Sequence, residues 1–139
     1  MLPFRTSEAG IEYLIRSEVT PCWSMEPVSS ALTGGWEGGE AVEDAQRELK
    51  EEAGYDAPLS DFIELGGSYA SKSSDTIYVL FAVNLTGQDV GEATGDGSVL
   101  EAEGKCIWMS EAELVHLYDP QLHVLLNRLK AIDHGKLPT

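Results

Sequence analysis

Residues 34–55 read Gly34-Gly35-Trp36-Glu37-Gly38-Gly39-Glu40-Ala41-Val42-Glu43-Asp44-Ala45-Gln46-Arg47-Glu48-Leu49-Lys50-Glu51-Glu52-Ala53-Gly54-Tyr55, a glycine-rich loop followed by an acidic segment. Within the segment, Val42, Ala45 and Leu49 recur at three- and four-residue spacing, which predicts one apolar face of a helix. Gly54 stands where a left-handed residue commonly ends a helix. The stretch therefore predicts a loop, an amphipathic helix and a glycine C-cap.

Three glutamates lie close together on this predicted helix. Glu48 stands three residues before Glu51 and four before Glu52, so all three side chains are expected to project from neighbouring positions one turn apart. Like charges at such spacing repel by roughly a few tenths of a kcal/mol per pair. A solvated helix of an unrelated acidic domain tolerates that repulsion, which is one interpretation. A hard cation that neutralises the cluster is the other, because Mg²⁺ prefers oxygen ligands.

The order of residues from Arg47 to Tyr55 resembles the second half of the Nudix box. That family pattern is a glycine, five residues, a glutamate, seven residues, and then Arg-Glu-apolar-x-Glu-Glu-x-Gly-apolar. The second half fits at its fixed positions, with Tyr55 as a loose match to the last apolar one. The first half is shortened: the family glutamate falls on Gly39, and the nearest glutamate is Glu40.

The resemblance implies a fold and a domain organisation. The Nudix fold is of the α/β (α+β) class, an α/β/α sandwich around a mixed β-sheet. With a length that suits a single core, we expect one Nudix hydrolase domain over residues 1–139.

The resemblance also implies a metal site and catalytic roles. Glu48 and Glu52 would be the principal ligands of Mg²⁺, with Mn²⁺ as an alternative, and Glu51 would assist. A backbone carbonyl of Gly34 or Gly35 would complete the site. Arg47 would orient the helix and its loop by pairing with Glu40 or a neighbouring carboxylate.

The general base is open between the box and a later acidic residue. A box glutamate, here Glu51, serves in some family members, and a late-loop glutamate serves in ADP-ribose pyrophosphatases. The long polar segment 86–104 offers Glu92, Glu101 and Glu103. We favour Glu101 because it precedes the strand around Trp108 by a few residues.

The implied reaction is hydrolysis of a diphosphate linkage in a nucleoside diphosphate derivative, with ADP-ribose or a nucleotide sugar as the leading substrate. Residues 67–76 resemble the segment that follows the box in ADP-ribose and nucleotide-sugar pyrophosphatases, but the proline usual there is absent. Two alternatives stay open: a pyrophosphatase that sanitises nucleoside triphosphates, and a non-catalytic Nudix-fold module that binds a nucleotide.

Four side chains are candidates for substrate binding. Tyr69 could stack on a base or ribose, and Lys72 could contact a phosphate. Trp36 and Trp23 could form a stacking wall. An ordinary place in the core or on the surface is an equally good interpretation for each aromatic residue.

The composition limits the choice of partners. The chain carries 24 acidic and 9 basic residues, a formal net charge of −15, which disfavours nucleic acid and anionic membranes as partners. The absence of a long apolar run and of a signal-peptide core predicts a cytoplasmic protein. Cys22 and Cys106 form no metal-ligand pattern and are expected to be reduced thiols. The family resemblance favours a homodimer.

The remaining elements follow from alternation, turn residues and caps. Residues 1–10 are expected to be a short lead-in, and 76–85 a central strand buried on both faces. Ser110 and Asp119-Pro120 are expected to open two late helices. The other expected strands cover residues 11–19, 28–33, 62–69 and 105–109.

Overall fold

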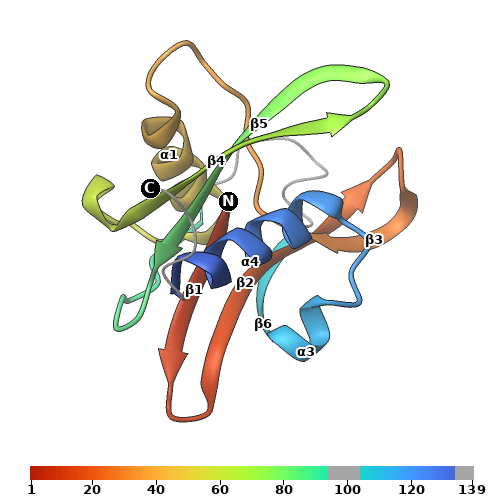
Figure 1. The fold of residues 1–139 in the computed structure, drawn as a ribbon. Helices are drawn as coiled ribbons and strands as arrows, with labels where there is room; N and C mark the ends of the chain where they lie inside the picture. The colour runs from red at the N-terminus through yellow and green to blue at the C-terminus, as the bar shows by residue number, and fades with distance from the viewer. Residues whose placement is uncertain (94–103, 134–139) are drawn as a thin grey trace.

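The computed structural model describes residues 1–93 and 104–133. Its strands are β1 (Leu2–Ser7), β2 (Gly10–Thr20), β3 (Ser24–Ser30), β4 (Phe62–Ser71), β5 (Ser74–Asn84) and β6 (Lys105–Ser110). Its helices are α1 (Ala41–Ala53), α3 (Glu111–Leu114) and α4 (Pro120–Asp133), with a 3-10 turn η1 at Leu59–Asp61. Figure 1 shows their arrangement.

The six strands form one mixed sheet that divides into two arms. β2 pairs with β6 along one edge, and along its other edge it pairs with β1 near its start and with β3 near its end, all antiparallel. β1 continues the sheet by pairing parallel to β5, which pairs antiparallel to β4. β3 is therefore one arm and β1-β5-β4 the other (Figure 1). Residues 31–40, which precede α1, have no regular structure.

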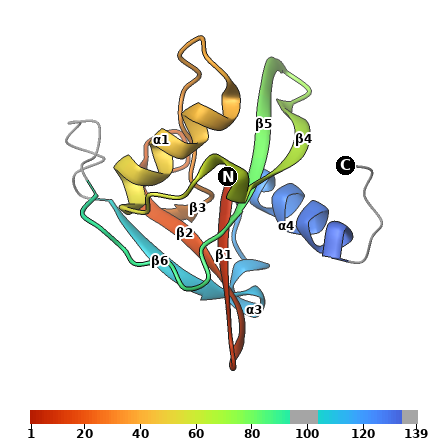
Figure 2. The same ribbon diagram turned by 90° about the vertical axis from the view of Figure 1, so that its left-hand side faces the viewer.

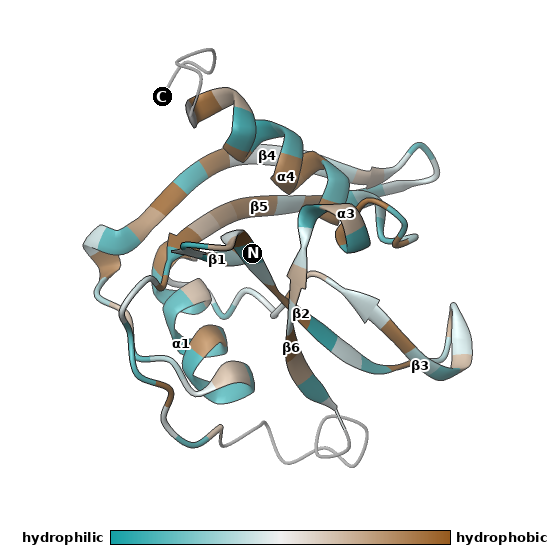
Figure 3. Cartoon of the chain, turned by 90° about the horizontal axis from the view of Figure 1, so that it is seen from below, coloured by the Kyte–Doolittle hydropathy of each residue, from teal (hydrophilic) through white to brown (hydrophobic). Residues whose placement is uncertain are grey.

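The two faces of the sheet are covered by different helices. Successive residues of β2 alternate between two apolar clusters: Leu14 faces the cluster that contains Leu49 of α1, and Ile15 faces the cluster that contains Leu122 and Leu125 of α4. Figures 2 and 3 show α1 and α4 on opposite sides of β5. The α/β/α sandwich around a mixed sheet, predicted from the sequence, is confirmed.

The box helix forms where the sequence predicts it. α1 buries Leu49 completely, and removing one such side chain from water stabilises a fold by about 1.5–3 kcal/mol. Gly54 ends the helix with a φ of 77°, and its backbone N–H donates to the carbonyl of Lys50 at 3.0 Å. A left-handed residue of this kind favours glycine, because a Cβ would strain the backbone.

Three expectations about the strands are wrong. Residues 1–10 are not a lead-in, because β1 lies inside the sheet with Leu2 fully buried. The strand expected at 28–33 lies earlier, as β3. The segment 76–85 forms β5, but only its second half is buried. Its first half extends beyond the pairing with β1, so Ile77 and Val79 are exposed.

The other expected elements are present within a few residues. β2, β4 and β6 occupy the predicted segments, and the register of β4 shifts between Glu64 and Gly67. Ser110 opens α3 as expected, and it forms a capping box with Glu113. Cys22 and Cys106 are free thiols, as expected.

Candidate active site

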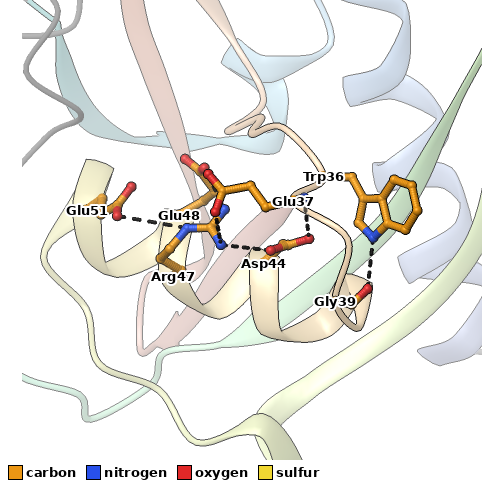
Figure 4. Close-up of polar contacts among 7 residues, drawn as sticks. All are labelled: Trp36, Glu37, Gly39, Asp44, Arg47, Glu48 and Glu51. Carbon is orange, nitrogen blue, oxygen red and sulfur yellow. Dashed lines mark hydrogen bonds and ion pairs between the residues drawn. The ribbon is translucent and has the colours of Figure 1, made fainter.

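Arg47 is the centre of a network of carboxylates on the box helix and its loop (Figure 4). Its Nη1 lies 2.7 Å from Asp44 Oδ1 and 3.2 Å from Glu37 Oε2. Its Nη2 lies 3.3 Å from Glu48 Oε1, and its Nε lies 3.9 Å from Glu51 Oε1. The hydrogen bond from Arg47 holds the pKa of Asp44 below its ordinary value. Arg47 is thus a cation already placed among the box carboxylates.

Arg47 pairs with neighbouring carboxylates, as the sequence suggested, but not with Glu40. No ion pair joins Arg47 and Glu40 among the described residues. Glu40 is the N-cap residue of α1, and its side chain makes no capping hydrogen bond. The single residue missing from the family pattern falls between Glu40 and Arg47, in the first turns of the helix.

Glu48 is pressed against the glycine loop. Its side chain is 15% exposed, and a Cβ added at Gly34 would overlap the Glu48 side chain, with Oε1 only 2.6 Å away. Burial is the main reason that the pKa of Glu48 is raised, and repulsion from Glu51 adds to it, although Arg47 acts in the opposite direction. Only a glycine leaves room for Glu48 at this point of the loop.

Glu52 lies on a different side of the helix from Arg47. It is 8% exposed, and its backbone carbonyl accepts a hydrogen bond from Arg16 Nη1 at 3.3 Å and one from the Cys106 thiol at 3.6 Å. These bonds tie the last turn of α1 to β2 and β6. Across residues 1–93 and 104–133, no three His, Cys, Asp or Glu side chains converge closely enough to hold a metal ion. The ligand set predicted from the sequence stays a prediction.

The donor chemistry nevertheless fits a hard divalent cation. Glu48 and Glu51 offer carboxylate oxygens, the type of ligand that Mg²⁺ prefers. The raised pKa of Glu48 shows that its carboxylate lacks enough compensation for its burial. A metal ion there would have to share Glu48 and Glu51 with Arg47, or displace it.

Glu48 also lines a hollow beside the box loop. The hollow has a volume of about 490 Å³ and is bounded by the loop, by α1 and by β5. The residues that line it include Gly34, Gly35, Trp36 and Ile77.

The loop is anchored where it begins. Ala31 N–H donates to Asp119 Oδ2 at 2.9 Å, and the Met1 amino group donates to the Leu32 carbonyl at 2.6 Å.

A second hollow of about 890 Å³ adjoins the first. It lies against β3 and the segment that joins α3 to α4, and the two hollows share Thr33, Tyr78 and Gln121 as lining residues. Gln121 is 8% exposed, and its Nε2 donates to the Tyr69 carbonyl at 3.1 Å. Volumes of this size are typical of small-molecule sites.

The structure brings two of the four predicted substrate-binding residues to these hollows. Trp36 lines the first hollow, is 75% exposed, and donates from its indole nitrogen to the Gly39 carbonyl at 2.8 Å. Trp23 lines the second hollow. Tyr69 is exposed on β4, Lys72 lies at the β4–β5 turn, and neither lines either of these two hollows.

Of the three late-loop candidates for the general base, only Glu92 lies among the described residues. Glu92 is exposed, and the neighbouring Gly91 donates its N–H to the Gly54 carbonyl at 2.7 Å, which brings this segment to the end of α1. Glu101 and Glu103 lie outside the described residues, so the preference for Glu101 stays a prediction.

Sequence reasoning missed several residues of the site. Asp44 could have been identified as a partner of Arg47, because the two are three residues apart on one helix. Glu37 could not, since its pairing depends on the path of the loop. Gln121 comes from α4 and reaches both hollows only through the fold.

Comparison with known proteins identifies the family. The model of the NUDIX domain matches residues 12–129. No curated protein matches the chain. In the described residues no helix is long and apolar enough to cross a membrane.

Several solved structures share the fold. An Ap4A hydrolase from C. elegans in a binary complex has a TM-score of 0.64 at 17% identity, covering 96% of this chain and 94% of that one. The NUDIX domain of Shewanella oneidensis NrtR, complexed with ADP ribose, has a TM-score of 0.64 at 11% identity, covering 96% and 84%. An ADP compounds hydrolase has a TM-score of 0.66 at 18% identity, covering 98% and 74%.

Identities this low show a common fold and nothing finer. The family match covers most of the chain and includes the box helix, its loop and the strands around them. Together with the mixed sheet between α1 and α4, it shows that this chain belongs to the Nudix family.

Proposed function

We propose that this protein is a Mg²⁺-dependent pyrophosphohydrolase that cleaves the diphosphate linkage of a nucleoside diphosphate derivative, with ADP-ribose or a nucleotide sugar as the leading substrate. The observation that carries the proposal is the position of Glu48. It is a largely buried carboxylate with a raised pKa, it lies on the box helix, and it lines a hollow of ligand size beside a glycine loop.

The residues in named roles are those of the box. Glu48, Glu51 and Glu52 would hold the cation, with a backbone carbonyl of Gly34 or Gly35. Such a cation supplies charge neutralisation for the phosphate oxygens and activates water for attack. Trp36 would contact the bound nucleoside, and Arg47 would keep the carboxylates oriented until the cation arrives.

The base that takes the proton from the attacking water is assigned to Glu101, with Glu92, Glu103 or the box glutamate Glu51 as the alternatives. Replacing each by glutamine separates them. If the base is a late-loop glutamate, its variant should lose kcat while keeping its affinity for Mg²⁺, because the metal ligands stay in place, whereas Glu51→Gln should lower both.

A second function has a specific observation in its favour. Arg47 pairs with Glu48 and Glu51, and no three carboxylates of the described residues are placed to hold a metal ion. This arrangement suits a nucleotide-binding module that does not turn its ligand over. Such a module would bind the nucleotide without a dependence on Mg²⁺.

Product chromatography with and without Mg²⁺ tests the proposal. The substrates are ADP-ribose, nucleotide sugars, dinucleoside polyphosphates and oxidised nucleoside triphosphates. We expect cleavage at a diphosphate only with Mg²⁺, and loss of nearly all cleavage in Glu48→Gln. Glu43→Gln is the matched control, because Glu43 is exposed on the same helix and lines neither hollow. Binding without cleavage across the panel would support the module instead.

A further inference from the structure

Only some carboxylates of the box helix border the hollow beside the glycine loop. Asp44 and Glu48 are the acidic residues of the described part of the chain that line this first hollow. Glu51 and Glu52 line neither of the two hollows. A cation that acts on a diphosphate has to contact the box and the phosphate oxygens together. Its protein ligands are therefore expected to include carboxylates that border the hollow.

Asp44 and Glu48 stand next to each other on α1. They are four residues apart, a spacing that brings two side chains onto one face of a helix, one turn apart. Both side chains are sheltered from solvent, with 14% of Asp44 and 15% of Glu48 exposed, whereas Glu37 is 71% exposed. Opposite charges attract more strongly in a sheltered place than in bulk water, so this pair is a better partner for a cation than the outer carboxylates are.

The box loop contacts both members of the pair. Asp44 Oδ2 accepts a hydrogen bond from the backbone N–H of Glu37 at 3.3 Å, and Glu48 lies against Gly34. Glu40, the glutamate nearest to the family position, is exposed and lines neither hollow. The carboxylate that stands beside Glu48 at the hollow is therefore that of Asp44 and not that of Glu40.

A positive charge already bridges the pair. Arg47 Nη1 lies 2.7 Å from Asp44 Oδ1, and Arg47 Nη2 lies 3.3 Å from Glu48 Oε1 (Figure 4). One cationic group thus reaches both carboxylates at once. Arg47 Nη1 also lies 3.2 Å from Glu37 Oε2, so the guanidinium keeps a counter-charge when Asp44 and Glu48 turn to another cation.

We propose that Asp44 is a further ligand of the divalent cation, and that Asp44 and Glu48 together form the part of its site that faces the substrate. This inference rests on the cation of the proposed function, and it adds to the ligands a residue at a position that the box pattern leaves open. Mg²⁺ is commonly bound by one or two carboxylates together with waters and substrate phosphates. Two carboxylates at the hollow are therefore enough to present the cation to a diphosphate.

Titration calorimetry with Mg²⁺ and no nucleotide tests the assignment in Asp44→Asn and Glu37→Gln. Each substitution replaces a charged partner of Arg47 by its neutral amide, but only Asp44 lines the hollow. The Kd for Mg²⁺ should rise at least tenfold in Asp44→Asn and less than threefold in Glu37→Gln, with similar melting temperatures in the absence of Mg²⁺. An unchanged Kd in Asp44→Asn, or equal losses in the two variants, would overturn the assignment.

Arg47→Gln separates a metal ligand from a residue that only positions Arg47. If Asp44 acts by drawing the guanidinium away from Glu48, its effect on Mg²⁺ binding should disappear once Arg47 is replaced, because the effects of two coupled residues do not add. If Asp44 is a ligand, adding Asp44→Asn to Arg47→Gln should still raise the Kd for Mg²⁺ at least tenfold. A rise of less than threefold in that background would reject the ligand role.

The same titrations keep this inference distinct from the proposed function. A wild-type protein that binds no Mg²⁺ would reject the metal-dependent hydrolase and the role of Asp44 together. Equal Mg²⁺ affinities of wild type and Asp44→Asn would reject the role of Asp44 alone. With a cleaved substrate in hand, the Mg²⁺ concentration that gives half the maximal rate should rise in Asp44→Asn by the same factor as the Kd.

Discussion

Adding a single methyl group at Gly34 should damage the site without damaging the fold. The new Cβ would overlap Glu48, whose Oε1 is only 2.6 Å away, whereas ordinary contact begins at 3.4 Å. Oε1 must therefore retreat by at least 0.8 Å (3.4 minus 2.6), and the carbons behind it must move as well. Cγ and Cδ of Glu48 lie nearer still to the new Cβ, so the whole side chain must turn away from Gly34 and not only its end. A side chain forced off its rotamer costs on the order of 0.5–1.5 kcal/mol.

Gly35→Ala is the control for this substitution. A Cβ at Gly35 meets nothing within 4 Å, and neither glycine has a φ in the left-handed region. In both variants alanine should reduce the conformational freedom of the unfolded chain, which stabilises a compatible site by about 0.4–1 kcal/mol. Both also keep the backbone carbonyls that are predicted to contact the metal. The two variants differ in whether the added Cβ overlaps the Glu48 side chain.

The expected magnitude follows from the displacement. Misplacing a reacting group by about 1 Å costs on the order of 100-fold in rate, so a shift of at least 0.8 Å should lower kcat/KM by about 10- to 100-fold. Titration calorimetry should show weaker Mg²⁺ binding to Gly34→Ala, and the melting temperature without Mg²⁺ should match that of Gly35→Ala within a few degrees. If Gly34→Ala binds Mg²⁺ and turns over as well as Gly35→Ala does, Glu48 is not a metal ligand.

Three further perturbations address the helix itself. Because the pKa of Glu48 is raised in the folded protein, the unfolded chain loses this proton first as pH rises, and ionised Glu48 then destabilises the fold. Glu48→Gln should therefore melt at a higher temperature than wild type at pH 7 without Mg²⁺. In a calorimetric pH series this gain should vanish below about pH 4, where the glutamate is protonated in both states. Arg47→Ala should lower the melting temperature at low salt, with a smaller loss at 1 M NaCl, because Glu48 and Glu51 lose their counter-charge. Gly54→Ala should lower the free energy of unfolding by at least about 1–2 kcal/mol in a urea titration, because φ is 77° and a Cβ would overlap the Gly91 carbonyl.

The sequence predicts those parts of the fold that depend on neighbours in the chain. α1 could be located because Val42, Ala45 and Leu49 share a face, and its end because Gly54 adopts a left-handed conformation. β1 could not, because Pro3 weakens the local strand pattern and, besides its hairpin with β2, the strand depends on pairing with β5, about 80 residues away. Long-range pairing leaves no periodic signal in a short segment.

The site is predictable to the same extent and for the same reason. The spacing from Arg47 to Glu52 is a local pattern, and so is the pairing of Arg47 with a residue one turn earlier. Lys72 lies at the β4–β5 turn and lines neither of the two hollows, so its contact with a phosphate stays a prediction. The junction of the hollows at Thr33 and Gln121 joins segments almost 90 residues apart, which no local pattern can anticipate.

The structure changes the physical argument for a metal ion. Repulsion among the box carboxylates suggested a cation, but Arg47 already supplies positive charge to Glu48 and Glu51. The repulsion alone therefore needs no metal. What Arg47 leaves uncompensated is the burial of Glu48 against the glycine loop, since its pKa remains raised even with the guanidinium 3.3 Å away. A hydrolase and a binding module could share the same acidic helix, and they differ in whether Mg²⁺ binds tightly enough to take Glu48 from Arg47. The affinity for Mg²⁺, compared between wild type and Glu48→Gln, is thus the quantity that separates the two functions.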